Sequence, residues 1–166
     1  MDLHPYDGKE RRFRHQDTRD RSVALEIIER LLATPLPSPT PRLLYDLSFY
    51  SGGMGVIDRL SLSLEADEAQ GRQIVANLRF VSPAELLASS DAEDFDWLIR
   101  SDESPCADAS AFGVALLAFI DEKKASFQPA LSAPERVWFA SGINVNDWSL
   151  VYLEDGWLHY LASDQG

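Results

Sequence analysis

The side chains best suited to covalent chemistry in this sequence are a single cysteine, Cys106, and three histidines. Cys106 and His159 could in principle act as a nucleophile and its general base. Cys106 stands, however, in the acidic segment DESPCADAS, where neighbouring carboxylates disfavour the reactive thiolate. We therefore interpret Cys106 as an incidental thiol, and the sequence predicts no catalytic residue.

Patterns for metal and phosphate binding are incomplete. His4 and His15 lack the helical pairing of metal ligands, and His159 stands alone. The acidic run from Asp91 to Asp96 lacks the glycine and the distal glutamate of a calcium loop. The turn SGGMG is followed by a strand pattern, whereas a phosphate loop leads into a helix. The sequence thus predicts neither a metal nor a cofactor.

The most distinctive constellation is the stretch SSDAEDFDWLIRSDESPCAD, in which carboxylates surround apolar residues. Such carboxylates can steer a protein toward a basic cleft, and tryptophan can supply the buried centre of an interface. Two further tryptophans lie in the C-terminal segment VNDWSLVYLEDGWLHYL. We predict a partner-binding surface built from Asp91, Glu93, Asp94, Asp96, Trp97, Asp102, Glu103, Asp108, Trp148 and Trp157.

Each part of this surface also has a structural interpretation. The acidic stretch could be a solvated helix face that Trp97 fastens to the core. The two C-terminal strand patterns are apolar on both faces, which is typical of strands that are covered on both sides. Their aromatic side chains could therefore belong to the core.

The net charge of the chain indicates which class of macromolecule it can bind. The chain has 15 basic and 27 acidic residues, for a net charge of −12, and its basic residues concentrate between Lys9 and Arg21. The strongly acidic remainder disfavours direct nucleic-acid binding and favours a basic protein partner. The sequence contains no apolar run long enough to span a bilayer, and residues 1–16 have no apolar stretch of the kind found in a secretory signal, so we expect them not to act as one. The single cysteine precludes an internal disulfide, and we therefore expect a cytoplasmic protein that does not bind membranes.

The spacing of apolar residues predicts the helices and strands of the N-terminal half. Residues 1–21 are expected to form a flexible basic arm, followed by a single acidic domain over residues 22–166. A helix is predicted from Ser22 to about Thr34, where the proline-rich segment TPLPSPTP ends it. Alternating apolar residues then predict three strands in an antiparallel meander, at residues 43–50, 56–65 and 74–81.

The C-terminal half is predicted to begin with helices and to end with strands. Ser82 and Pro83 are typical of a helix start, DFDWLIR predicts a short helix, and residues 111–126 predict the longest one. Strands are expected at residues 136–140, 148–154 and 157–162, the last two joined by the hairpin turn Asp155-Gly156. The fold class predicted is a single α+β domain, with about six mostly antiparallel strands and three or four helices.

These observations favour a binding function. The expected function is that of a small interaction protein that neutralises a basic partner, most concretely an immunity or antitoxin-type inhibitor that occludes the active site of a bacterial toxin. Two alternatives remain open at this point: a secretion-type chaperone or adaptor, and a small hydrolase or ligand-binding enzyme with a site near Trp148, Trp157 and His159. The sequence leaves the oligomeric state open.

Overall fold

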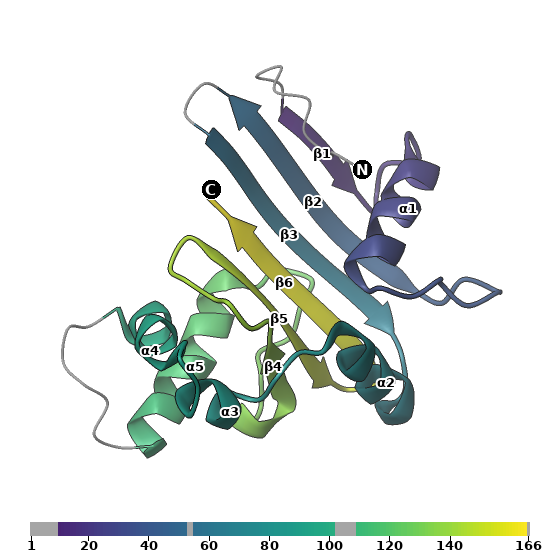
Figure 1. Cartoon of the computed structure of the whole chain (residues 1–166). Helices are drawn as coiled ribbons and strands as arrows, with labels where there is room; N and C mark the ends of the chain where they lie inside the picture. The colour runs from purple at the N-terminus through teal and green to yellow at the C-terminus, as the bar shows by residue number, and fades with distance from the viewer. Residues whose placement is uncertain (1–9, 53–54, 102–108, 166) are drawn as a thin grey trace.

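The computed structural model describes residues 10–52, 55–101 and 109–165. It contains one antiparallel sheet of six strands in the order β1-β2-β3-β6-β5-β4 (Figure 1). The strands are β1 (Glu10–Arg14), β2 (Leu43–Gly52), β3 (Gly55–Glu65), β4 (Val137–Phe139), β5 (Asp147–Glu154) and β6 (Trp157–Asp164). The helices are α1 (Arg21–Leu31), α2 (Glu68–Leu78), α3 (Pro83–Leu87), α4 (Ala92–Arg100) and α5 (Ala109–Lys123). The predicted α+β fold class is confirmed.

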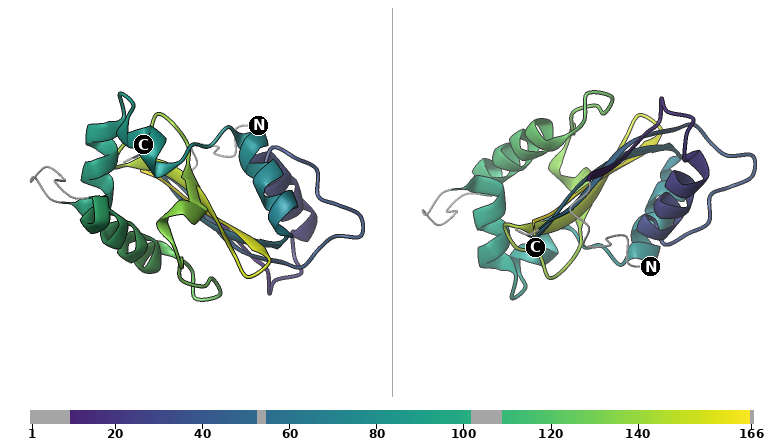
Figure 2. Two further views of the ribbon diagram at one scale, coloured as in Figure 1. Left: turned by 90° about the horizontal axis from the view of Figure 1, so that it is seen from below. Right: turned by 90° about the horizontal axis from the view of Figure 1, so that it is seen from above.

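Helices cover both faces of the sheet, as the two end-on views in Figure 2 show. Helices α1 and α2 pack on one face and enclose a core with the alternate residues of β2 and β3 that point toward them. Helices α3, α4 and α5 pack on the other face, over β4, β5 and β6. Because β5 and β6 lie between the two helical layers, their residues alternate between two cores, which explains why both of their faces are apolar.

The predicted strand at residues 74–81 is wrong, because residues 68–78 form helix α2. A capping box starts this helix: the Asp67 side chain accepts from the Gln70 backbone amide, and the Gln70 side chain accepts from the Asp67 amide. Gly71 then lets the helix approach β5 closely, since a Cβ at this position would lie 2.6 Å from Leu153 Cδ2. The place beside β3 that a third meander strand would occupy is taken by β6.

Five residues of the expected flexible arm are part of the sheet, and the arm's first nine residues lie outside the described residues. Glu10–Arg14 form the edge strand β1, which pairs with β2 in the same sheet as the acidic body. The Arg12 guanidinium contacts both carboxylate oxygens of Asp46 on β2, at 2.9 and 2.8 Å. This bidentate pair joins a basic residue of the segment to an acid of the body.

Most other elements agree with expectation to within a few residues. The predicted hairpin between the last two strands is confirmed, with Asp155 and Gly156 both at positive φ, 53° and 80°. Ser82 caps α3 by accepting from the Glu85 amide at 3.2 Å. The five helices among the described residues exceed the predicted three or four, because α2 was taken for a strand. No helix in the described ranges has the length and apolar character needed to cross a membrane.

Candidate functional site

Helix α4 carries the exposed part of the predicted binding surface. Its inner side buries Phe95, Leu98 and Ile99, and its outer side exposes Glu93, Asp94 and Trp97. Residues three and four positions apart lie on the same side of a helix, so both carboxylates neighbour the indole. The amphipathic pattern of nine residues therefore presents one aromatic side chain beside two acids.

Aromatic packing fixes the position of α4. The fully buried ring of Phe95 lies 5.4 Å from the ring of Phe112 on α5 and 4.9 Å from that of Phe139 on β4, in edge-to-face geometry in both cases. The N-terminal end of the helix is held as well, because the backbone amide of Gly142 donates to Oδ2 of the N-cap residue Asp91 at 2.9 Å. The exposed face of α4 is thus carried by a helix that contacts the core at several points.

The seven predicted acids fall into three groups. Glu93 and Asp94 are exposed on α4. Asp91 accepts the Gly142 hydrogen bond, and Asp96 is mostly buried with Arg100 Nε 3.7 Å from its Oδ1, so these two make contacts within the fold. Asp102, Glu103 and Asp108 lie outside the described residues. Of the described acids in the predicted surface, two are therefore available to a partner.

The three predicted tryptophans do not meet at one place. Trp97 is 48% exposed, whereas Trp148 on β5 is 8% exposed and packs edge-to-face against Phe119 at 5.1 Å. Trp157 begins β6, at the end of that strand farthest from Ser163, which pairs with Trp148. The Arg42 guanidinium lies 5.3 Å from the centre of the Trp157 ring. Only Trp97 joins exposure to the acids of α4.

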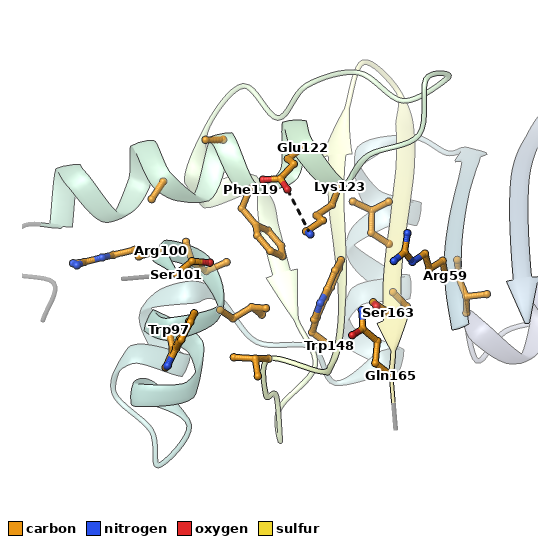
Figure 3. A pocket seen from close by; sticks show the side chains of 18 of the residues that line it. Arg59, Trp97, Arg100, Ser101, Phe119, Glu122, Lys123, Trp148, Ser163 and Gln165 are labelled. Carbon is orange, nitrogen blue, oxygen red and sulfur yellow. Dashed lines mark ion pairs between the residues drawn. The ribbon is translucent and has the colours of Figure 1, made fainter. Parts of the chain in front are cut away.

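A cleft of about 830 Å³ lies beside α4, between α4 and α5 on one side and the ends of β3, β6 and β5 on the other (Figure 3). Trp97 and Arg100 line its α4 side, and Trp148 lies deeper within it. Arg59 of β3 and Lys123 of α5 also line it, and sequence reasoning missed both residues. Arg59 was visible only as one polar position of a strand, and nothing local indicated that β3 and α5 meet across β6.

The predicted alternative site around His159 is a buried polar cluster. Ser63 Oγ and His159 Nδ1 are hydrogen-bonded at 2.7 Å, and both residues are almost fully buried, at 0% and 3% exposed. The Tyr152 ring lies 4.8 Å from the imidazole, and its hydroxyl donates to the Pro129 carbonyl at 2.9 Å. Burial lowers the pKa of His159 from its ordinary 6.5 to about 4, partly offset by the nearby Glu154.

This cluster lies where the connector after α5 packs against the sheet. The Gln128 side chain, also buried, donates to the Leu62 carbonyl at 3.0 Å from the same connector. A serine–histidine pair that acts in catalysis needs a substrate within reach of the hydroxyl. Because Ser63 has no exposed surface, the pair serves packing and polar satisfaction in this conformation.

No protein-family model, no curated protein and no solved structure matches this chain. Its function is therefore inferred from its own geometry and charge. The surface of α4 combines an exposed indole, two outward carboxylates and an excess of negative charge over the whole chain. Exposed tryptophan and complementary charge are both features that protein–protein interfaces use.

Proposed function

We propose that this protein is an interaction protein that binds and neutralises a more basic protein partner through helix α4. In its most concrete form, it is an immunity or antitoxin-type inhibitor that occludes the active site of a toxin. The observation that carries the proposal is the outer face of α4, where Trp97 is 48% exposed between Glu93 and Asp94 on the one side and the cleft on the other.

The two kinds of side chain on α4 would have different roles in binding. Tryptophan is enriched among the few interface residues that account for most of the binding free energy, because its burial removes a large apolar area from water. The carboxylates of Glu93 and Asp94 would attract Arg or Lys side chains near the partner's active site and raise the association rate. The chain's net charge of −12 extends this attraction beyond the contact surface.

Occlusion requires a surface that keeps its shape, since ordering a flexible segment reduces affinity. Helix α4 meets this requirement through the packing of Phe95 and the hydrogen bond between Asp91 and Gly142. The hydrolase alternative receives less support, because His159 is 3% exposed and Trp157 lies at the far end of β6. Inhibition by steric blocking needs no catalytic group in the inhibitor.

The proposal is tested with tagged wild-type protein and the variant Glu93→Lys/Asp94→Lys, each used to capture partners from a lysate of the cells that encode it. We expect the wild type to retain one basic protein until a high-salt step and the charge-reversed variant to lose it. With the purified partner, Trp97→Ala should weaken binding by about thirtyfold, because a central interface tryptophan contributes roughly 2 kcal/mol or more. The wild type should also inhibit the partner's activity in stoichiometric amounts.

The matched control reverses two acids of α1, on the opposite side of the sheet, as Glu26→Lys/Glu29→Lys. This control has the same net charge as the α4 variant, so it separates a local effect from a general one. If the two variants retained the partner equally, or lost it equally, the role of α4 would be contradicted. The inhibitor proposal would be overturned if no stoichiometric partner were captured, or if the wild-type protein left the activity of the captured partner unchanged.

A further inference from the structure

The cleft beside α4 differs in charge from the rest of the molecule. Its charged lining residues are Arg59, Arg100 and Lys123, against the single carboxylate of Glu122. The chain as a whole has a net charge of −12. A lining with a cationic excess in so acidic a protein marks the cleft as a place where an anion would be attracted rather than repelled.

Two of the cations reach toward the interior of the cleft. Figure 3 shows Arg59 extending from β3 and Lys123 from α5, with the Trp148 ring below Lys123 in this view. Among the described residues, no carboxylate lies within ion-pair distance of Arg59, which is exposed. Lys123 Nζ lies 3.7 Å from a Glu122 oxygen and 5.8 Å from the Phe119 ring centre. The Glu122 side chain is 75% exposed, so water screens its attraction for Lys123.

Arg100 has a different role. Its side chain points away from the cleft interior in Figure 3, and its Nε lies 3.7 Å from Asp96 Oδ1 on the preceding turn of α4. Its charge is therefore compensated locally. Of the described lining residues, the two cations available to an anion are Arg59 of β3 and Lys123 of α5.

Beside these cations, the cleft is lined by two aromatic side chains and by several polar groups. Phe119 and Trp148 contribute the small accessible parts of their rings, being 6% and 8% exposed, while Ser163 and Gln165 of the last strand and its end offer hydroxyl and amide groups. A volume of about 830 Å³ falls within the range of sites that hold small organic molecules.

We propose that this cleft is a binding site for a small anionic molecule with a flat apolar body. Its acidic group lies between the Arg59 guanidinium and the Lys123 ammonium, and its ring system packs against Trp148 and Phe119. Guanidinium and ammonium groups both bind carboxylate, sulfonate and phosphate oxygens, so the shared requirement is negative charge next to a planar apolar group. This site goes beyond the proposed partner-binding function and does not depend on it, because the residues that hold the anion are not on α4.

The test uses anilinonaphthalene sulfonate as the anionic probe and phenylnaphthylamine as its uncharged counterpart, with probe fluorescence as the readout. We expect the folded protein to bind the sulfonate at least about tenfold more tightly than the uncharged probe, and increasingly weakly as salt is added. Arg59→Ala and Lys123→Ala should each weaken sulfonate binding about tenfold, since each removes a hydrogen bond to a charged group. Arg59→Lys should restore part of the affinity lost in Arg59→Ala.

Two matched controls remove a cation from outside the cleft. Lys124→Ala removes the residue next to Lys123; Lys124 itself forms an ion pair with Asp121. Arg42→Ala removes a guanidinium that stacks on Trp157. Both controls should bind the sulfonate like the wild type. Equal binding of the two probes, undiminished binding by Arg59→Ala/Lys123→Ala, or no binding of the sulfonate by the wild type would overturn the proposal. Far-UV circular dichroism of each variant verifies that its fold is intact.

Discussion

The buried imidazole of His159 couples the stability of the fold to pH. In the folded protein its pKa is about 4, chiefly because burial disfavours the charged form, whereas an exposed histidine titrates near 6.5. Its Nε2 atom has no hydrogen-bond partner among the described residues, and the nearby Glu154 offsets only part of the cost of burying the imidazolium. The unfolded chain therefore takes up a proton at higher pH than the folded chain does.

Because the unfolded chain takes up the proton first, His159 makes the fold less stable as the pH falls. A group with a lowered pKa in the folded state contributes stability above the unfolded pKa, and that contribution is lost as pH falls from about 6.5 to about 4. We expect His159 to account for a loss of roughly 3 kcal/mol in the free energy of unfolding over this window. Urea denaturation at a series of pH values measures the loss in the wild type.

The variant Ser63→Ala/His159→Phe isolates the histidine, because it removes both partners of their hydrogen bond and leaves no unpaired hydroxyl. Its free energy of unfolding should fall less steeply between pH 6.5 and 4 than that of the wild type, while the acids common to both chains cancel in the difference. Parallel curves for the two proteins would show that His159 is not the titrating group.

Helix α2 shows that a short capping signal can decide between helix and strand. Asp67 and Gln70 form a complete capping box, and Gly71, Ile74 and Val75 have the spacing of a buried helix face. The same segment also alternates apolar and polar residues from Ile74 to Phe80, which predicts a strand. The two patterns overlap in the sequence, and burial against β5 favours the helix.

Removing the cap should therefore destabilise α2 measurably. Asp67→Ala deletes the oxygen that accepts from the Gln70 amide, and we expect it to lower the free energy of unfolding by about 1 kcal/mol. Asp67→Asn keeps an acceptor at the same position and should cost much less. Thermal or urea unfolding of the three proteins checks this, and an Asp67→Asn variant as unstable as Asp67→Ala would show that charge rather than capping matters.

Local signals predicted elements well where a single pattern was present. Ser82 with Pro83 and Glu85 marked α3, and Asp155-Gly156 marked the hairpin of β5 and β6. Strand β1 had no such signal, because its residues are mostly charged and its pairing depends on β2, far away in sequence. The sheet order was equally inaccessible, since the neighbour of β3 is the last strand of the chain.

The candidate site was predictable to a similar extent. Composition singled out the acidic stretch and Trp97, and the structure places Glu93, Asp94 and Trp97 on one exposed face. Sequence could not tell that Asp91 makes a contact within the fold, because its partner Gly142 lies in a distant loop. The pair of Asp96 with Arg100, four residues later on the same helix, is by contrast a local pattern. The cleft depends on five elements meeting, α4, α5, β3, β5 and β6, which no local pattern encodes.

At the scale of the whole molecule, one sheet serves two cores. Val151, Leu153 and Leu158 pack toward α1 and α2, while Leu150 and Leu161, on the same two strands, pack toward α4 and α5. Neither helical layer can lose its packing without exposing β5 and β6 to water. The two layers are therefore expected to unfold in one cooperative transition.

Truncations on opposite sides of the sheet test this coupling. Ile28→Ala in α1 and Leu116→Ala in α5 both remove fully buried side chains, and each should lower the free energy of unfolding by about 2 to 5 kcal/mol. In each variant, unfolding followed by circular dichroism and by tryptophan fluorescence should give superimposable curves. A variant whose two probes report separate transitions would mean that the layers are independent units.

The exposure of Trp97 has a consequence for observing the molecule. One indole lies half in water on α4, while that of Trp148 is enclosed in the core. Indoles in water emit at longer wavelengths than enclosed ones, so the surface assigned to the partner contains its own optical reporter. A partner that covers α4 should therefore shift the tryptophan fluorescence of this protein to shorter wavelength, so binding can be followed without an attached label.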